Sequence, residues 1–179
     1  MKYNVILIGE CGAGKSSLVQ SMTGTKVRAH NDATAGTVKV KDYSTTIQGK
    51  QFKIWDTPGL SGGNQGTSTQ AEANVKELIS KLRRSEGVHL LVFCTLGGRA
   101  TRVLENFYST FFQRVCGTTV PAVLVVTHLD DRRDREGWWD RNAAAFERMN
   151  MTFRGHACVS DKLKASPKER KGGISCIIS

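Results

Sequence analysis

The sequence has few cysteines and no long apolar stretch, the features that would stabilise an extracellular domain or span a membrane. Its five cysteines are scattered and odd in number, and none has the spacing of a metal-ligand pair. Free thiols are therefore expected, without a disulfide or zinc framework. No apolar stretch approaches the length of a bilayer, and the N-terminal residues do not have the pattern of a secretion signal. These absences predict a cytoplasmic protein.

Acidic and aromatic residues are also few. The chain has 16 acidic residues against 26 lysines and arginines, giving a net charge of +10, and only 7% of its residues are aromatic. A basic charge is compatible with nucleic-acid binding, but no aromatic stacking platform or nucleic-acid module accompanies it, so no nucleic-acid partner is expected. With 179 residues, 39% of them hydrophobic, the chain is long enough for one domain with a buried core.

What the sequence does contain is one strong motif near its start. Residues 9–16 read Gly-Glu-Cys-Gly-Ala-Gly-Lys-Ser, after the apolar run 5–8 and before the amphipathic stretch 17–22. This strand–loop–helix setting predicts a P-loop, whose backbone N–H groups surround a phosphate. Lys15 is expected to neutralise the β- and γ-phosphates, and the Ser16 hydroxyl to bind Mg²⁺. The residues expected to contact the nucleotide here are Gly9, Glu10, Cys11, Gly12, Ala13, Gly14, Lys15, Ser16 and Ser17.

Strand-like and helix-length segments alternate along the chain, which predicts an α/β fold with helices on both faces of a mostly parallel sheet. The turn at 48–50 predicts a hairpin that adds one antiparallel edge strand. The polar segments 25–36 and 59–69 are expected to be moving loops. Strands are expected at 5–8, 38–47, 51–55, 89–96, 121–126 and 156–160. Helices are expected at 17–22, stopping near Gly24, around 75–82, at 104–115 and at 136–149.

A second motif, Trp55-Asp56-Thr57-Pro58-Gly59, ends a later strand and resembles the G3 element of GTPases. An acid at the end of a strand can reach Mg²⁺ through a water molecule, which is the role expected for Asp56. Gly59 is expected to offer its N–H to the γ-phosphate. The resemblance also implies a threonine that meets Mg²⁺ and the γ-phosphate, for which Thr37 is preferred and Thr34 is the alternative. Lys15, Thr37 and Gly59 are therefore the expected catalytic residues.

A third motif, Thr127-His128-Leu129-Asp130, follows an apolar strand, where the family pattern reads Asn or Thr, then Lys, any residue and Asp. The Asp130 carboxylate can accept from both N1–H and the exocyclic amine of guanine, a donor pair that adenine lacks. His128 replaces the usual lysine, and an imidazole can stack on the purine instead. Ser160-Asp161-Lys162 is similar to the loop that touches the base through backbone groups, which makes Ser160 a further nucleotide-binding candidate.

Together these motifs resemble a small P-loop GTPase of the translation-factor class. The segment 96–101 is similar to the immunity-associated, avirulence-induced type (AIG/GIMAP) of GTPase. The Thr-His form of the base motif resembles that type and the chloroplast import receptor GTPases, and septins are related. The resemblance implies a G domain, Mg²⁺ as cofactor, GTP or GDP as ligand, and GTP-dependent homodimers or oligomers at membranes. Leu60 stands where Ras-like enzymes have the glutamine that orients water, so slow hydrolysis is expected. A non-hydrolysing GTP-bound scaffold and a P-loop kinase are the alternatives.

The last residues predict a tail distinct from the G domain, with 1–160 as the domain and 161–179 as the tail. The chain finishes with Cys176-Ile177-Ile178-Ser179, a C-a-a-X box that predicts prenylation of Cys176. Lysines and arginines precede it, and a lipid together with a basic stretch anchors a protein durably at an anionic membrane surface. The tail has no apolar periodicity, so the helix that usually closes a G domain is expected to be missing.

Overall fold

The structure is a computed structural model of the 179-residue chain, and it describes residues 1–24, 39–60, 65–98, 102–129 and 136–160. Its centre is a six-stranded sheet with the strand order β2-β3-β1-β4-β5-β6. All neighbouring strands are parallel except β2, which runs antiparallel to β3 at one edge. The strands are β1 (Lys2–Gly9), β2 (Lys41–Ile47), β3 (Lys50–Asp56), β4 (Leu90–Leu96), β5 (Ala122–Thr127) and β6 (Gly155–Cys158).

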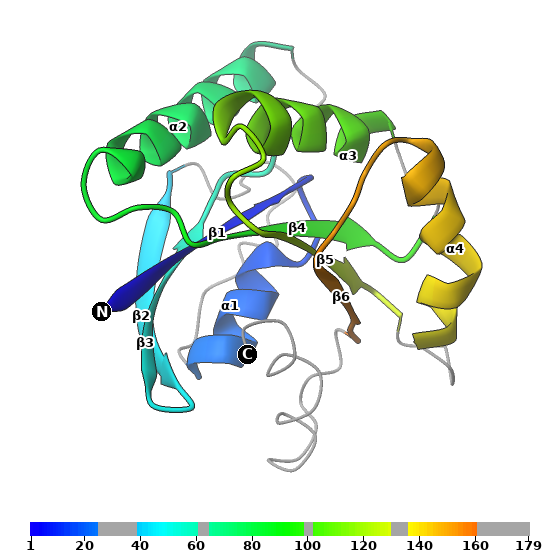
Figure 1. Ribbon diagram of the computed structural model, residues 1–179, viewed down its shortest axis with the longest axis horizontal. Coiled ribbons are helices and arrows are strands. Elements are labelled where there is room, and N and C mark those ends of the chain that lie inside the picture. Colours follow the sequence, from blue (N-terminus) through cyan, green and yellow to red (C-terminus); the bar gives the residue numbers. More distant parts are fainter. Residues whose placement is uncertain (25–38, 61–64, 99–101, 130–135, 161–179) are drawn as a thin grey trace.

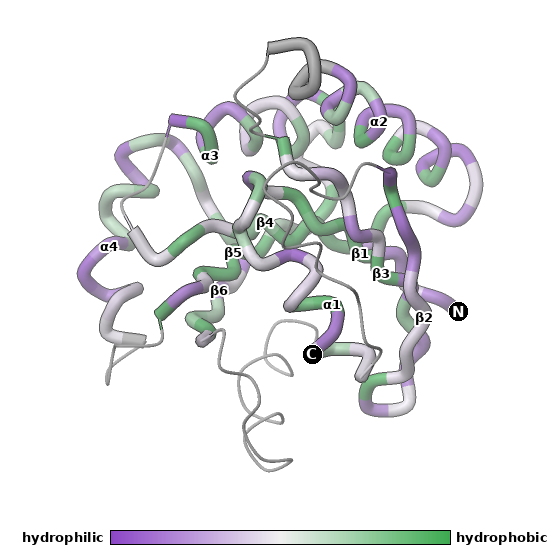
Figure 2. Tube along the Cα trace, turned by 180° about the vertical axis from the view of Figure 1, so that it is seen from behind, coloured by the Kyte–Doolittle hydropathy of each residue, from purple (hydrophilic) through white to green (hydrophobic). Residues whose placement is uncertain are grey.

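Helices lie on both faces of this sheet (Figure 1), so the predicted three-layer α/β architecture is confirmed. One face packs its apolar side chains against α2, η1 and α4, and the other packs against α1. The central strands are buried on both sides, which explains why most of β4 and β5, and β1 from Val5 onward, are apolar (Figure 2). The helices are α1 (Lys15–Thr23), α2 (Gln65–Arg83), α3 (Arg102–Phe107), the π-helix η1 (Tyr108–Val115) and α4 (Glu136–Arg148).

The predicted hairpin is confirmed, with a turn of two residues. Gln48 and Gly49 both have positive φ, 49° and 78°. Two consecutive left-handed residues form the type of turn whose twist matches antiparallel strands. The register pairs Ile47 with Lys50 and Lys41 with Asp56, so the antiparallel edge strand begins beside the Asp56 motif.

Two predictions about the helices need correction. Residues 65–69 were expected within a moving loop, but they form the first turns of α2. Their polar composition suggested a loop, whereas a helix that continues into the buried residues Val75 and Ile79 can extend through polar turns. The predicted helix 104–115 is also not a single α-helix, because from Tyr108 onward it is a π-helix. Apolar side chains spaced three and four residues apart fit both helix types, so the pattern could not distinguish them.

Candidate nucleotide-binding site

The P-loop connects β1 to α1 at the carboxyl edge of the sheet, where parallel α/β folds bind their ligands. Gly12 and Gly14 have φ values of 77° and 76°, a conformation that side chains with a Cβ rarely adopt. A Cβ on Gly14 would lie 3.1 Å from Cγ2 of Thr127, and one on Gly9 would collide with the carbonyl oxygen of Cys94. The glycines therefore allow both the turn and the close packing of the loop on β4 and β5.

Lys15 is almost completely buried at the start of α1, with 6% of its surface exposed. Its Nζ donates to the carbonyl oxygens of Gly9 at 2.9 Å and Glu10 at 2.8 Å, which directs the ammonium into the loop. Burial lowers the pKa of Lys15, while the neighbouring carboxylate of Asp56 acts in the opposite direction. Burial also raises the pKa of the Cys94 thiol to about 12, so this neighbour stays protonated. The site thus holds a desolvated cation, which suits the binding of phosphate.

Ser16 and Asp56 meet although they lie 40 residues apart in the sequence. The Ser16 hydroxyl donates to Asp56 Oδ2 at 2.7 Å, while Oδ1 is buried and has no hydrogen-bond partner among the described residues. Burial raises the pKa of Asp56, against the hydrogen bond from Ser16 and the charges of Lys15 and Lys41. A hydroxyl next to a carboxylate with one unused oxygen is a set of hard oxygen ligands that fits Mg²⁺. In the described residues no cluster of three histidine, cysteine or acidic side chains forms a metal site of another kind.

The segment after Asp56 lies directly against the P-loop. The N–H of Leu60 donates to the Gly9 carbonyl at 3.2 Å, and the Thr57 hydroxyl donates to the Leu7 carbonyl at 2.6 Å. A Cβ on Gly59 would lie 2.5 Å from Cα of Cys11, so only glycine fits this close approach. Gly59 is therefore beside the phosphate loop, as its expected role requires. Leu60, at the position of the missing glutamine, is buried in the core that α2 covers.

The Thr127 motif forms the other side of the site. The Thr127 hydroxyl lies 3.3 Å from the Ala13 carbonyl, 3.2 Å from the Thr95 carbonyl and 2.9 Å from Nδ1 of His128. A hydroxyl has one proton, and the carbonyls can only accept it. When Thr127 donates to either carbonyl, its oxygen must accept from an Nδ1–H of His128, which fixes the tautomer of the neutral ring. The exposed His128 has a φ of 58°, so it turns out of the strand at this point.

Other expected site residues are placed as follows. Ser160 is buried just after β6, beside the strand that carries Thr127, because Val159 bonds to Val126. Ser17 is exposed in the first turn of α1. Thr34, Thr37, Asp130 and Cys176 lie outside the described residues. The structure therefore brings together the P-loop, Asp56, Gly59, Thr127 and His128.

Several residues that support this site were not found from the sequence. Cys94 and Thr95 form its floor on β4, and Thr57 ties the Asp56 motif to β1. Their side chains are small or common at strand ends, so nothing marks them in the sequence. Asn4 is different, because it is a polar residue at the start of the apolar run of β1. A polar residue next to an apolar run is visible in the sequence, so Asn4 could have been identified from it.

Comparisons with known proteins agree with this geometry. Residues 4–128 match the protein family described as 50S ribosome-binding GTPase. Immune-associated nucleotide-binding protein 3 of Arabidopsis thaliana is 33% identical over 127 residues, which is 69% of this chain and 36% of that protein. The chain thus spans about a third of the length of this relative.

Solved structures show the same fold. The ribosomal-RNA complex of Era with MgGDPNP superposes with a TM-score of 0.74 and 17% identity, covering 98% of this chain and 55% of that one. A dimerisation-deficient variant of Toc33 from Arabidopsis thaliana gives a TM-score of 0.68 and 19% identity, covering 92% of this chain and 73% of that one. With the P-loop, the Asp56 motif and the sheet order already described, the chain belongs to the 50S ribosome-binding GTPase family and has the fold of a P-loop GTPase G domain.

Proposed function

We propose that this chain binds GTP and GDP together with Mg²⁺, hydrolyses GTP slowly, and acts as a switch or assembly GTPase. The observation that carries this proposal is the meeting of Lys15, the Ser16–Asp56 pair and Gly59 around one loop. Each group has a separate task in phosphoryl transfer, and few other arrangements need all of them at one place.

In the proposed mechanism, the P-loop N–H groups and Lys15 hold the β- and γ-phosphates and disperse their charge. Ser16, Asp56 through water, and Thr37 (or Thr34) would hold Mg²⁺, which when bound neutralises charge on the β- and γ-oxygens. Gly59 contributes its N–H to the γ-phosphate, so loss of that group on hydrolysis releases the segment that follows. Asp130 reads guanine, and His128 packs on the base.

Slow hydrolysis follows from Leu60. Its side chain is 1% exposed and apolar, so it has no group with which to orient an attacking water. In Ras-type enzymes the residue with this task contributes substantially to the rate. A second molecule that supplies the absent group would raise the rate. Dimerisation is named as important for the GTPase activity of the chloroplast translocon components Toc33 and Toc159, which supports this form of activation. The same observation favours a second candidate function, a GTP-bound scaffold that does not hydrolyse its nucleotide.

Two measurements test the proposal. Titration with GDP, GTP, ADP and ATP, with and without Mg²⁺, should show guanine nucleotides binding at least about a hundredfold more tightly than adenine nucleotides, because adenine lacks the pair of donors that the Asp130 carboxylate accepts from guanine. Equal binding of adenine nucleotides would contradict the role of Asp130. Single-turnover hydrolysis of GTP should then accelerate with protein concentration. No turnover at any concentration would favour the scaffold.

The second part of this proposal concerns attachment to a membrane. Among the described residues no helix has the length and apolar character needed to cross a bilayer. We propose peripheral attachment on the cytosolic face through a prenyl group on Cys176 and the basic residues of 161–179. Incorporation of a labelled isoprenoid into the wild-type protein, and its loss in Cys176→Ser, is the test. Equal recovery of both proteins with membranes would refute this part.

A further inference from the structure

One polar side chain lies within the otherwise apolar first strand. Asn4 has none of its surface exposed, and the residues that follow it, Val5 to Ile8, belong to the core. Burying an amide is unfavourable unless each of its polar groups is hydrogen-bonded. A leucine or valine here would continue the core at no such penalty, so the presence of Asn4 calls for a physical reason.

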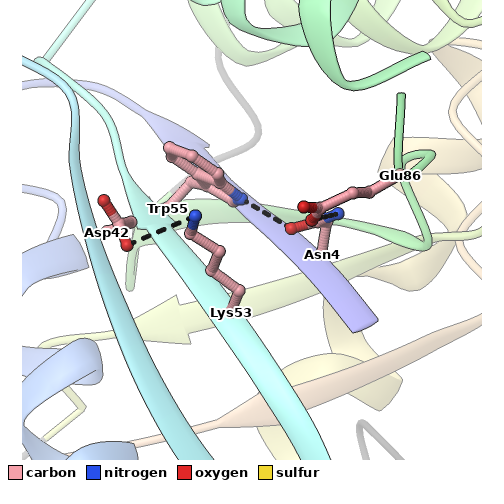
Figure 3. Close-up of polar contacts among 5 residues, drawn as sticks. All are labelled: Asn4, Asp42, Lys53, Trp55 and Glu86. Carbon is pink, nitrogen blue, oxygen red and sulfur yellow. Dashed lines mark hydrogen bonds and ion pairs between the residues drawn. The ribbon is translucent and has the colours of Figure 1, made fainter. Parts of the chain in front are cut away.

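The side chain of Asn4 joins two segments that are far apart in the sequence (Figure 3). Its Oδ1 accepts from Nε1 of Trp55 at 3.1 Å. Its Nδ2 donates to Oε2 of Glu86 at 3.3 Å. The same Nδ2 also donates to the Gly87 carbonyl at 3.0 Å. The opposite orientation of the amide would place two donors together at Trp55 and acceptors together at Glu86 and Gly87. The partners therefore fix the amide in one orientation.

Further contacts hold both sides of this junction. The backbone N–H of Asn4 donates to Nδ1 of His89 at 3.0 Å, and the backbone N–H of His89 donates to the Asn4 carbonyl at 2.9 Å. On the other side, Nζ of Lys53 lies 4.5 Å from the centre of the Trp55 ring and 3.6 Å from Asp42 (Figure 3). Trp55 is thus held by its edge at Asn4 and across its face at Lys53.

The hydrogen-bond partners of the Asn4 side chain lie at the two ends of one segment of the chain. Trp55 directly precedes Asp56, and Glu86 follows the end of α2. Everything between them, including Gly59, Leu60 and the whole of α2, is a segment whose two ends are both bonded to Asn4. Close to its Trp55 end, the segment also touches the P-loop through Leu60 and Gly59. Asn4 therefore holds together the two ends of the segment that is expected to sense the γ-phosphate.

We propose that Asn4 is a positioning residue that favours the triphosphate over the diphosphate, an inference that rests on the proposed function. By fixing Trp55, it fixes the end of β3 from which Asp56 and Gly59 extend. Gly59 then reaches a γ-phosphate without a large loss of conformational entropy, because its segment is already held in place. GDP makes no contact with Gly59, so its affinity gains nothing from this ordering. Asn4 acts through Trp55 and does not itself touch the nucleotide.

A merely structural role for Asn4 predicts something different. If the junction only stabilised the fold, its loss would lower the melting temperature and weaken GDP and GTP equally. If it positions Gly59, its loss must change the ratio of the two affinities. The ratio is thus the quantity to measure, since general destabilisation cancels from it.

The test compares Asn4→Leu, Trp55→Phe and the double variant in the full chain. Trp55→Phe keeps an aromatic ring beneath Lys53 and removes the N–H that donates to Asn4, together with part of the indole ring. Dissociation constants for GDP and for a non-hydrolysable GTP analogue are measured with Mg²⁺. Each single variant should lower the preference for the triphosphate roughly fivefold or more. The double variant should add little, because both changes remove the same bond.

Tyr108→Phe is the control. Tyr108 donates its hydroxyl proton to the Thr152 carbonyl at 2.7 Å and accepts from the Thr152 N–H at 3.0 Å. Its loss removes hydrogen bonds of a buried side chain outside the segment between Trp55 and Glu86. This variant should melt at a lower temperature and keep the nucleotide preference unchanged.

Several outcomes would overturn the inference. It is wrong if Trp55→Phe leaves the preference unchanged, and this variant decides the question should Asn4→Leu fail to fold. It is also wrong if both nucleotides weaken equally, or if Tyr108→Phe shifts the preference as much. Wild-type protein that binds neither guanine nucleotide would instead refute the proposed function, and that result is visible before any variant is made.

Discussion

Replacing Asp56 with asparagine should make the protein more stable and a poorer ligand for Mg²⁺. Asp56 is 1% exposed, and its Oδ1 is buried without a hydrogen-bond partner among the described residues. Leaving a buried polar atom unpaired costs about 1–3 kcal/mol, and more when the group is charged. Asparagine removes the charge and can still accept from Ser16 through its carbonyl oxygen, although its amide N–H groups are then poorly satisfied.

The expected net gain is about 1 kcal/mol, equivalent to a rise of about 2–4 °C in melting temperature for a domain of this size. The assay is thermal unfolding in the absence of nucleotide, with a chelator to remove Mg²⁺. Asp42→Asn is the matched control. The Asp42 side chain is 47% exposed and pairs with Lys53 at 3.6 Å, so its loss should change stability by less than about 0.5 kcal/mol.

The difference between Asp56→Asn and the wild type should depend on pH. Burial raises the pKa of Asp56 above its ordinary value of 3.8, so the folded state binds this proton more tightly than the unfolded state. The penalty of the charged form is therefore present in full above the folded-state pKa. It disappears as the pH falls through that value, where the wild-type carboxyl takes up its proton. The advantage of the asparagine variant should thus shrink between pH 7 and about pH 4.

Although Asp56→Asn should stabilise the fold, it should weaken the binding of GTP in the presence of Mg²⁺. The dependence of GTP affinity on Mg²⁺ should fall about tenfold or more in Asp56→Asn, since hydrogen bonds to a charged group contribute about 1.5–3 kcal/mol. The reasoning is refuted if the variant is less stable than the wild type at pH 7 without Mg²⁺. It is equally refuted if Mg²⁺ strengthens GTP binding to the same extent in both proteins.

Three other substitutions test the remaining parts of the site. Gly59→Ala places a Cβ 2.5 Å from Cα of Cys11. Calorimetric titration should show GDP affinity retained within about threefold and the affinity for a GTP analogue lowered about tenfold or more. If the variant binds the analogue as tightly as the wild type does, Gly59 does not lie at the γ-phosphate. Thr127→Val removes a hydroxyl that donates to the Ala13 or the Thr95 carbonyl, so chemical unfolding should show a loss of about 1–3 kcal/mol, and an unchanged midpoint would contradict this hydrogen bond. Leu60→Gln buries an amide in the core, so it should lower stability by about 1–3 kcal/mol without accelerating single-turnover hydrolysis. A rate increase of tenfold would instead mean that position 60 reaches the attacking water.

Local patterns in the sequence were sufficient to predict most of this fold. The P-loop, the hairpin at 48–50 and the alternation of strands and helices depend on neighbouring residues, and the structure confirms them. The first turns of α2 and the π-helix η1 were not predicted. Both depend on what the helix packs against, and tertiary contacts of this kind leave no periodic signal in the sequence.

In the site, too, local motifs could be predicted from the sequence, whereas contacts between distant segments could not. Lys15, Ser16 and Gly59 lie where their motifs placed them, because each motif determines its own loop conformation. The role of Asn4 depends on Trp55 and on Glu86, which lie 51 and 82 residues away in the sequence. Such a junction becomes visible only when distant segments are seen side by side. The roles assigned to the site residues stay predictions, and those of Thr37 and Asp130 fall outside the described residues.

The distribution of thiols has a practical consequence for labelling. Among the described residues, Cys11 is the exposed cysteine, whereas Cys94, Cys116 and Cys158 are buried. Burial raises the pKa of Cys94 and of Cys116, so both react slowly with maleimides near neutral pH. With Cys176 replaced by serine, an environment-sensitive fluorophore would attach preferentially to Cys11. Its emission would follow the approach of the Gly59 segment in real time, without any cysteine having to be introduced.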